Sequence, residues 1–167
     1  IPVDPGSAFG TGQHETTALC AQAIDQIAAE VGLGDFADVG CGTGILGIGA
    51  QLLSAQRIWM VDNDPLAVAG AQENIEMMGL ESVVELTCAP RPVHEHQFHT
   101  VVANILAPVL IRLCEDLSAL VAEQGRLLLS GLLVTQIAEV EAPFLAKGWR
   151  RKRLHCEGEW ALLWLER

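Results

Sequence analysis

The sequence predicts an α/β fold with a mostly parallel sheet that is covered by helices on both faces. Short apolar runs alternate with helical patterns between residues 36 and 146, which is typical of parallel strands joined by helical crossovers. A glycine-rich turn at 40–44 joins the first of these runs to a helical pattern. The last two predicted strands, 149–156 and 160–165, are separated by only three residues, so one of them must run antiparallel.

Composition and charge indicate one globular domain that does not bind nucleic acid directly. The 167 residues are 50% hydrophobic and 19% charged, which is enough for a sizeable core. The formal net charge of −11 disfavours nucleic-acid contact, because phosphate neutralisation needs Lys and Arg. The basic cluster at 150–153 is interpreted as a solvated strand end, with a partner contact as the alternative.

Cysteine usage and hydropathy are typical of a cytoplasmic protein. The five cysteines are widely spaced and none forms a C-x-x-C pair, so we expect reduced thiols and no structural zinc. No uncharged apolar run approaches ~18 residues, so we expect no membrane contact.

The first predicted elements are a loop and a helix. The loop, 1–13, is rich in Pro and Gly. The helix that follows has apolar residues at helical spacing, and its N-cap is expected at Thr16 or Thr17. Gly32 and Gly34 end it.

The rest of the chain alternates strands with helices. Before the final hairpin, strands are predicted at 36–39, 58–61, 83–88, 100–103 and 126–130, and helices at 44–54, 65–78, 107–122 and 134–146. Pro65 suits the first turn of its helix and Gly79 closes that helix, whereas Pro143 should bend or fray the last one. A polar segment with two prolines, 89–98, is predicted to be a loop.

Several candidate binding residues directly follow strand ends. Gly40, Gly42 and Gly44 follow the first strand, Asp62 ends the second, and Asn104 ends the fourth. Ligands of open parallel sheets bind outside the carboxyl ends of the strands, so these residues should converge at one edge. Glycines permit positive φ and close approach of a ligand, and a helix start offers unpaired N–H groups. We therefore expect a nucleotide-like ligand here.

The glycine spacing and the carboxylates favour S-adenosylmethionine over a dinucleotide. The turn reads G-x-G-x-G, whereas the dinucleotide fingerprint is G-x-G-x-x-G. Asp38 would repel a pyrophosphate but suits a cation such as a sulfonium or an α-ammonium. Asp62 is suited to both ribose hydroxyls, with helix capping as its alternative, and Asp64 is the preferred cap of the next helix.

Several segments together resemble a known enzyme family. Residues 38–44, Asp62 and the Asn-Ile-Leu at 104–106 resemble the class I, Rossmann-like methyltransferases, which have a seven-stranded sheet. The opening segment, 4–17, is similar to the D-P-G-x-A-F-G-T-G-x-H-x-T-T motif of the bacterial PrmA-type enzymes, which methylate ribosomal protein eleven of the large subunit. Residues 130–133 resemble the S-G-I-L of that family, and the similarity spans essentially the whole chain.

The resemblance implies S-adenosylmethionine as cofactor, with contacts from Thr17, Gly40, Asp62 and Asn104. Simple capping is the alternative for Thr17, and a left-handed turn residue is the alternative for Asn104. With the residues argued from the turn itself, the expected cofactor-binding set is Thr17, Asp38, Gly40, Gly42, Gly44, Asp62 and Asn104. The resemblance also implies one catalytic domain over 1–167, with the N-terminal substrate-recognition domain of the family missing from this chain.

Asn104 is the expected catalytic residue. Methyl transfer from a sulfonium needs positioning and desolvation, because the donor is already activated. An amine acceptor must arrive neutral, and Asn104 offers an acceptor that would hold it in line. No general base is assigned, and His14 is expected to pack in its loop.

Two other groups of residues are expected to have no chemical role. His94, His96 and His99 fit no common zinc spacing, so no metal site is expected. Cys41, inside the glycine turn, is interpreted as a small filler beneath the ligand.

The predicted function is methylation of lysine side chains or of an N-terminal amine of a ribosomal protein. One alternative keeps the chemistry and changes the acceptor to another protein lysine or a small molecule. The others are a donor-binding module that is inactive alone and an NAD-dependent oxidoreductase.

Overall fold

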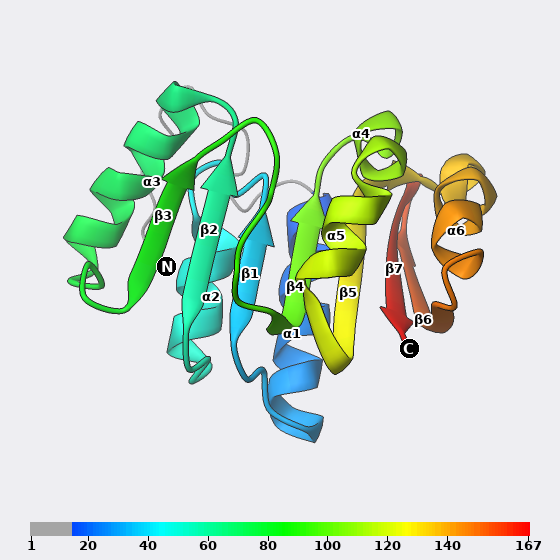
Figure 1. Ribbon diagram of the computed structural model, residues 1–167, viewed down its shortest axis with the longest axis horizontal. Helices are drawn as coiled ribbons and strands as arrows, with labels where there is room; N and C mark the ends of the chain where they lie inside the picture. The colour runs from blue at the N-terminus through cyan, green and yellow to red at the C-terminus, as the bar shows by residue number, and fades with distance from the viewer. Residues whose placement is uncertain (1–14) are drawn as a thin grey trace.

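The computed structural model describes residues 15–167 and contains one seven-stranded sheet (Figure 1). The strands lie in the order β3-β2-β1-β4-β5-β7-β6. They are β1 (Phe36–Val39), β2 (Ile58–Asp62), β3 (Val84–Cys88), β4 (Phe98–Asn104), β5 (Val121–Leu133), β6 (Arg150–Glu157) and β7 (Trp160–Glu166). β7 is antiparallel to its neighbours β5 and β6, and the other pairs are parallel. The predicted fold class, with its C-terminal antiparallel hairpin, is confirmed.

The helices cover the two faces of the sheet in two groups (Figure 1). α1, α2 and α3 pack on one face, and α4, α5 and α6 pack on the other. Their bounds are α1 (Glu15–Glu30), α2 (Ile45–Leu52), α3 (Pro65–Met77), α4 (Ala107–Arg112), α5 (Cys114–Leu120) and α6 (Ile137–Leu145), with a 3-10 turn, η1 (Val134–Gln136), before α6. The predicted covering of both faces is thus confirmed.

Two apolar cores follow from the alternation of side chains along the strands. In β2, Trp59 and Val61 enter the core shared with α4, α5 and α6, whereas Ile58 and Met60 enter the core shared with α1, α2 and α3. All four side chains are at most 2% exposed. A strand buried on both faces needs a continuous apolar run, and this is the pattern that the sequence has there.

One predicted helix is wrong, because residues 107–122 form two helices and the start of a strand. α4 ends at Arg112 and α5 begins at Cys114, with Leu113 between them at a ψ of 8°. Val121 is already extended and pairs with Phe98, so β5 begins there and not at residue 126. No Gly or Pro marks the break, so the helical spacing of apolar residues runs through it unchanged.

The predicted capping role of Thr16 or Thr17 is also wrong. Both lie inside the first turn of α1, which the described residues show from Glu15 onward, and both are buried. They are buried because this turn approaches the end of β4, where Thr17 meets Asn104. The predicted loop at 1–13 and His14 lie outside the described residues.

The basic cluster at 150–153 lies on β6, at the edge of the sheet. Arg151 Nε lies 2.8 Å from Glu141, and Arg153 Nη2 lies 3.1 Å from Glu30. Residues 150–152 are exposed, which agrees with the interpretation of the cluster as a solvated strand end. Within the described part of the chain, no helix is both long and apolar enough to span a bilayer.

Candidate functional site

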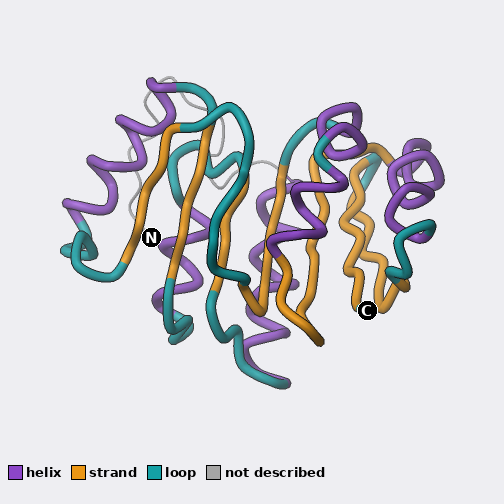
Figure 2. The backbone as a smooth tube through the Cα atoms, viewed as in Figure 1, coloured by secondary structure: helices purple, strands orange, loops and turns teal. Residues whose placement is uncertain are grey.

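A cavity of about 550 Å³ opens at the carboxyl edge of the parallel strands, where connecting loops gather (Figure 2). It lies over the ends of β3, β2, β1 and β4, which are neighbours in that order. Its walls include residues from the segments that follow each of these strands: 89–90, 62–64, 40–42 and 104–106. The structure therefore brings the strand ends together as the sequence predicts.

The turn between β1 and α2 presents its backbone to the cavity. Gly40, Gly42 and Gly44 have φ angles of +74°, +55° and +78°, the left-handed region that favours glycine. The Gly40 N–H donates to Val61 O over 2.8 Å and ties the turn to β2. A Cβ on Gly40 would lie 2.3 Å from Cγ2 of Ile105, so space also demands glycine there. Gly40 and Gly42 line the cavity, whereas Gly44 lies behind its wall.

The Asp62 carboxylate is held in place by backbone amides on both oxygens. Oδ2 accepts from Gly42 N–H over 2.9 Å, and Oδ1 accepts from Asp64 N–H over 3.0 Å. An ionised carboxylate has about four acceptor sites, so each oxygen keeps capacity for a ligand hydroxyl. Asp64 caps α3 by accepting from Leu66 N–H over 2.9 Å, which confirms its predicted role.

Asn104 and Thr17 meet at the other end of the cavity. Asn104 Nδ2 donates to Thr17 Oγ1 over 3.4 Å, and both residues line the cavity. Thr17 is only 4% exposed, so this contact is largely shielded from bulk solvent. With Nδ2 engaged, Oδ1 of Asn104 is the side-chain atom that remains to accept from a ligand.

Asp38 lies beneath the glycine turn and does not line the cavity. It is 1% exposed, and its Oδ2 accepts from Gly47 N–H in α2 over 3.1 Å. Burial raises the pKa of Asp38 to about 7, a hydrogen bond from Gly47 opposes that rise, and the nearby Asp62 carboxylate adds to it. The geometry gives Asp38 a supporting role for the turn, so its direct contact with a cofactor stays a prediction.

Cys41 lines the cavity at the turn but is not set up to react. Burial raises the pKa of its thiol, and the Asp38 and Asp62 carboxylates raise it further. A thiol with a raised pKa stays protonated and is a poor nucleophile. This agrees with the interpretation of Cys41 as a filler.

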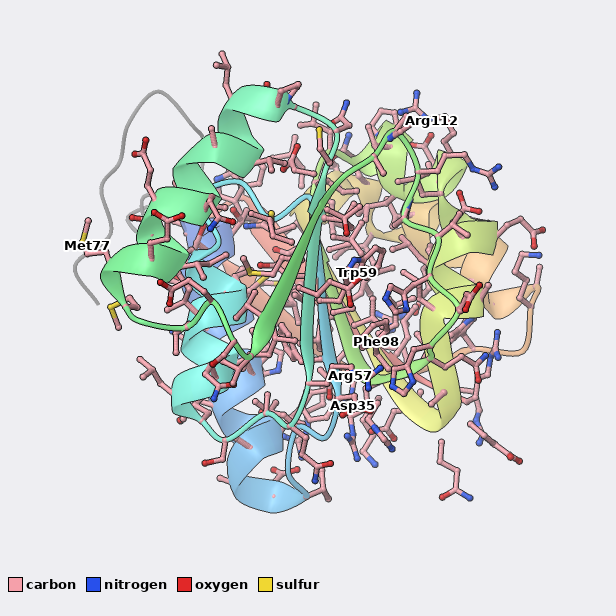
Figure 3. The ribbon with its side chains drawn as sticks, turned by 60° about the vertical axis from the view of Figure 1, so that its left-hand side comes forward. Asp35, Arg57, Trp59, Met77, Phe98 and Arg112 are labelled. Carbon is pink, nitrogen blue, oxygen red and sulfur yellow. The ribbon has the colours of Figure 1, made fainter. Side chains whose placement is uncertain are left out.

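The charges around the cavity are unevenly distributed. Among the described residues that line it, Asp62 and Asp64 are anionic and Arg112 is the one cation. Arg112 lies in the last turn of α4, at the end of the molecule away from Asp35 (Figure 3). Two carboxylates against one guanidinium favour a ligand with positive charge over an anionic one.

Several lining residues were not identified from the sequence. Pro90, Pro92, Arg112 and Leu113 form part of the wall, with Val109 one helical turn from the last two. The spacing of Val109, Arg112 and Leu113 is that of one helix face, so this signal was present in the sequence. Pro90 and Pro92 had no such signal, because their position depends on the path of the loop over the sheet.

The histidines near 94–99 have other partners. His94 Nε2 lies 3.3 Å from Glu85, and His96 Nε2 lies 2.7 Å from Asp35 at the edge of the sheet remote from the cavity (Figure 3). His99 Nδ1 accepts from the Asp35 N–H. Among residues 15–167, no three His, Cys, Asp or Glu side chains are grouped to hold a metal ion.

The comparisons with known proteins agree with one another. The family model of ribosomal protein L11 methyltransferase (PrmA) matches residues 1–167. The chain is 42% identical over 163 residues to the ribosomal protein L11 methyltransferase of Gloeobacter violaceus, covering 98% of this chain and 51% of that protein. It is 45% identical over 163 residues to that of Geobacter metallireducens, covering 98% and 53%. The chain thus spans about half the length of the curated relatives it matches.

A solved structure gives the same result. The ribosomal protein L11 methylase of Lactobacillus delbrueckii subsp. bulgaricus superposes with a TM-score of 0.88 at 30% identity, covering 99% of this chain and 83% of that one. A family match over the full length, together with these identities, shows that the chain belongs to the ribosomal protein L11 methyltransferase family.

Proposed function

We propose that this chain is the catalytic domain of a methyltransferase that uses S-adenosylmethionine and modifies amines of a ribosomal protein. Family membership supports the activity. The relatives are named ribosomal protein L11 methyltransferases, which supports L11 as the substrate. The observation that carries the proposal is the convergence of Asp62, the turn at 40–42 and Asn104 on one cavity.

The order of the strands favours one orientation of the donor. Asp62 has acceptor capacity left for the ribose hydroxyls. On one side of it, after β3, the apolar wall of Ala89 and Pro90 suits the adenine base. On the other side, the backbone at 40–42 and then Asn104 suit the methionine arm. When bound, the donor supplies a methyl group that is already activated on a sulfonium.

The charge of the cavity favours this donor over a dinucleotide. Asp62 and Asp64 both line it, and like charges repel strongly in a partly desolvated site. S-adenosylmethionine carries no phosphate and brings a positive charge near the reacting end. The alternative of an NAD-dependent oxidoreductase is disfavoured by the glycine spacing, which is G-x-G-x-G and not G-x-G-x-x-G.

Asn104 is the residue that we assign to the acceptor amine. Its Oδ1 accepts from the amine N–H and so turns the nitrogen lone pair toward the donor. Ile105 and Leu106 line the cavity beside it, and apolar walls favour the neutral form of an amine. Positioning and desolvation are thus the contributions of this chain, and no general base is assigned.

Binding measurements test the cofactor. Calorimetry of the chain with S-adenosylhomocysteine should give binding, and calorimetry with NAD should give none. Binding of NAD without binding of S-adenosylhomocysteine would contradict the proposal.

Methylation assays test the acceptor. The chain is incubated with labelled S-adenosylmethionine and purified ribosomal proteins, and label is expected on lysine side chains or the α-amine of L11. Label on other proteins only would reject the ribosomal acceptor, and binding without any transfer would identify an inert donor-binding module.

A further inference from the structure

The loop at 89–97 crosses one face of the sheet on its way from the end of β3 to the start of β4 (Figure 2). Its first residues form part of the cavity wall. Pro90 and Pro92 line the cavity, whereas Arg91 between them does not. The Arg91 side chain therefore leaves the loop on the side away from the ligand space.

Arg91 makes a bidentate ion pair with Asp116 of α5. Its Nε donates to Oδ2 over 2.9 Å, and its Nη2 donates to Oδ1. The Arg91 side chain is 66% exposed and the Asp116 side chain is 11% exposed, so the carboxylate is the fixed partner. Two parallel hydrogen bonds from one guanidinium fix the direction of the Arg91 side chain as well as its distance from Asp116, so the pair restricts the orientation of the loop.

The ion pair joins two segments that both contribute to the cavity wall. Asp116 lies in the first turn of α5, where Leu113 O accepts from Leu117 N–H over 2.8 Å. Leu113 lines the cavity on the α4 side, and Pro90 and Pro92 line it on the loop side. One side-chain contact thus links the loop part of the wall to the α5 segment next to Leu113.

Among the hydrogen bonds of the described residues, no other one joins positions 90–92 to α4 or α5. Proline has no N–H, so positions 90 and 92 donate no backbone hydrogen bond. The Val93 N–H donates to Arg91 O over 3.0 Å, which is a contact within the loop itself. The other anchors of the loop lie on either side of this part: Ala89 N–H donates to Asp62 O over 3.0 Å before it, and after it His94 pairs with Glu85, His96 pairs with Asp35, and Gln97 Nε2 donates to Ala119 O of α5 over 3.2 Å.

We infer that Arg91 and Asp116 are positioning residues that hold the Pro90–Pro92 wall at the width required by the adenine end of the methyl donor. This inference rests on the proposed function. The pair does not touch the donor; it acts by restricting the loop, so its loss lowers affinity for the base end and leaves the methyl-transfer step intact.

A neighbouring ion pair supplies a matched control. Glu115 precedes Asp116 in α5 and pairs with Lys147, which follows α6. Neither Glu115 nor Lys147 lines the cavity. Removing this pair changes the same helix and removes the same kind of contact without releasing the loop.

The first measurement is the dissociation constant of S-adenosylhomocysteine for Arg91→Ala, Asp116→Ala, the double variant and Lys147→Ala. Arg91→Ala and Asp116→Ala should each weaken binding up to about fivefold, the upper end of the range of one exposed ion pair. The double variant should bind no more weakly than the weaker single one, because both remove one interaction. In the Arg91 and Asp116 variants, the affinity for adenosine should fall by the same factor, and kcat at saturating donor should not change. The control Lys147→Ala should bind S-adenosylhomocysteine as tightly as the wild type.

The second measurement is hydrogen exchange of the segment 89–97 without ligand. Arg91→Ala should speed exchange there and Lys147→Ala should not. Unchanged exchange, or equal losses of affinity in both pairs, would overturn the inference. If the wild-type chain bound no S-adenosylhomocysteine, the proposed function would be wrong. Hydrogen exchange of 89–97 would then still show whether the ion pair restricts the loop.

Discussion

The side-chain amide of Asn104 donates to the hydroxyl of Thr17 over 3.4 Å and so joins the end of β4 to the first turn of α1. The two residues are 87 positions apart in the sequence, and both line the cavity. Because the NH2 group of the Asn104 amide faces Thr17, its Oδ1 atom points away from Thr17. This contact therefore sets the orientation of the atom that is proposed to accept from the amine.

Removing the Asn104 side chain should slow methyl transfer and spare donor binding. Asn104→Ala is expected to lower the single-turnover rate about 10- to 100-fold, the loss that misplacement of a reacting group produces. Its affinity for S-adenosylhomocysteine should change much less. A full single-turnover rate with normal donor binding would show that the positioning role is wrong.

The partner of Asn104 can be tested with two substitutions of different chemistry. Thr17→Val keeps the branched shape and removes the hydroxyl, so the Asn104 amide loses its partner and the single-turnover rate should fall. Thr17→Ser keeps the hydroxyl and should retain most of the rate. Equal rates in the two variants would mean that the hydrogen bond does not orient Asn104.

Replacing Asp62 should weaken donor binding strongly. Asp62→Asn exchanges one oxygen for an NH2 group, which must then face a backbone N–H or a ribose hydroxyl. A hydrogen bond to a charged group contributes ~1.5–3 kcal/mol, so calorimetry should show S-adenosylhomocysteine binding weaker by about 10- to 150-fold. The control is Asp64→Asn, because Asn caps a helix as well as Asp does. Equal losses at both positions would reject a ribose contact specific to Asp62.

The strand ends could be predicted from the sequence because chain order and local residue type determine them. Gly40, Asp62 and Asn104 each follow a short apolar run, and parallel strands bring their carboxyl ends to one edge. The direction in which a side chain leaves a turn is not local information. Asp38 points beneath the turn toward the Gly47 N–H, which only the packing of α2 against β1 reveals.

The break between α4 and α5 could not be predicted for a related reason. The apolar spacing continues through Leu113 with no Gly or Pro, and the chain turns there because Val121 must reach its partner in β4. Pro90 and Pro92 were assigned correctly to a loop, but their place in the cavity wall depends on the path of the loop, and the residue between them, Arg91, pairs with Asp116 of α5. Tertiary packing determines both features.

Adding a methyl group at Gly40 should cost stability and donor binding. Gly40→Ala meets an unfavourable φ of +74° and a contact of 2.3 Å with Ile105 Cγ2. The control is Gly79→Ala, which has a similar φ of +66° but no neighbour within 4 Å.

The two glycine variants separate backbone strain from the steric clash. A residue with a Cβ in the left-handed conformation costs ~1–2 kcal/mol, so urea unfolding should show that both variants lose about this much free energy of unfolding. Gly40→Ala should lose about 1–3 kcal/mol more from overpacking, together with S-adenosylhomocysteine binding. Ile105→Ala in the same chain should recover part of the stability. Equal destabilisation of the two variants would show that the turn accommodates a side chain.

The buried Asp38 should make stability depend on pH. Burial raises its pKa from the usual 3.8 to about 7, so between these values the folded chain holds a proton that the unfolded chain has lost. The free energy of unfolding therefore falls as the pH rises through this window, by an amount on the order of a few kcal/mol. Asp38→Asn keeps an acceptor for the Gly47 N–H and does not titrate, so its stability should change less between about pH 5 and about pH 8.

Urea unfolding at about pH 5 and about pH 8 measures this pH dependence. The control is a variant in which the same change in net charge is made elsewhere. Glu73→Gln removes one negative charge from the exposed face of α3 and should keep the wild-type difference between the two pH values. If Asp38→Asn keeps that difference too, another group causes the pH dependence, and Asp38 is ionised beneath the turn. In that case the Gly47 N–H donates to a charged acceptor over the whole of this pH range.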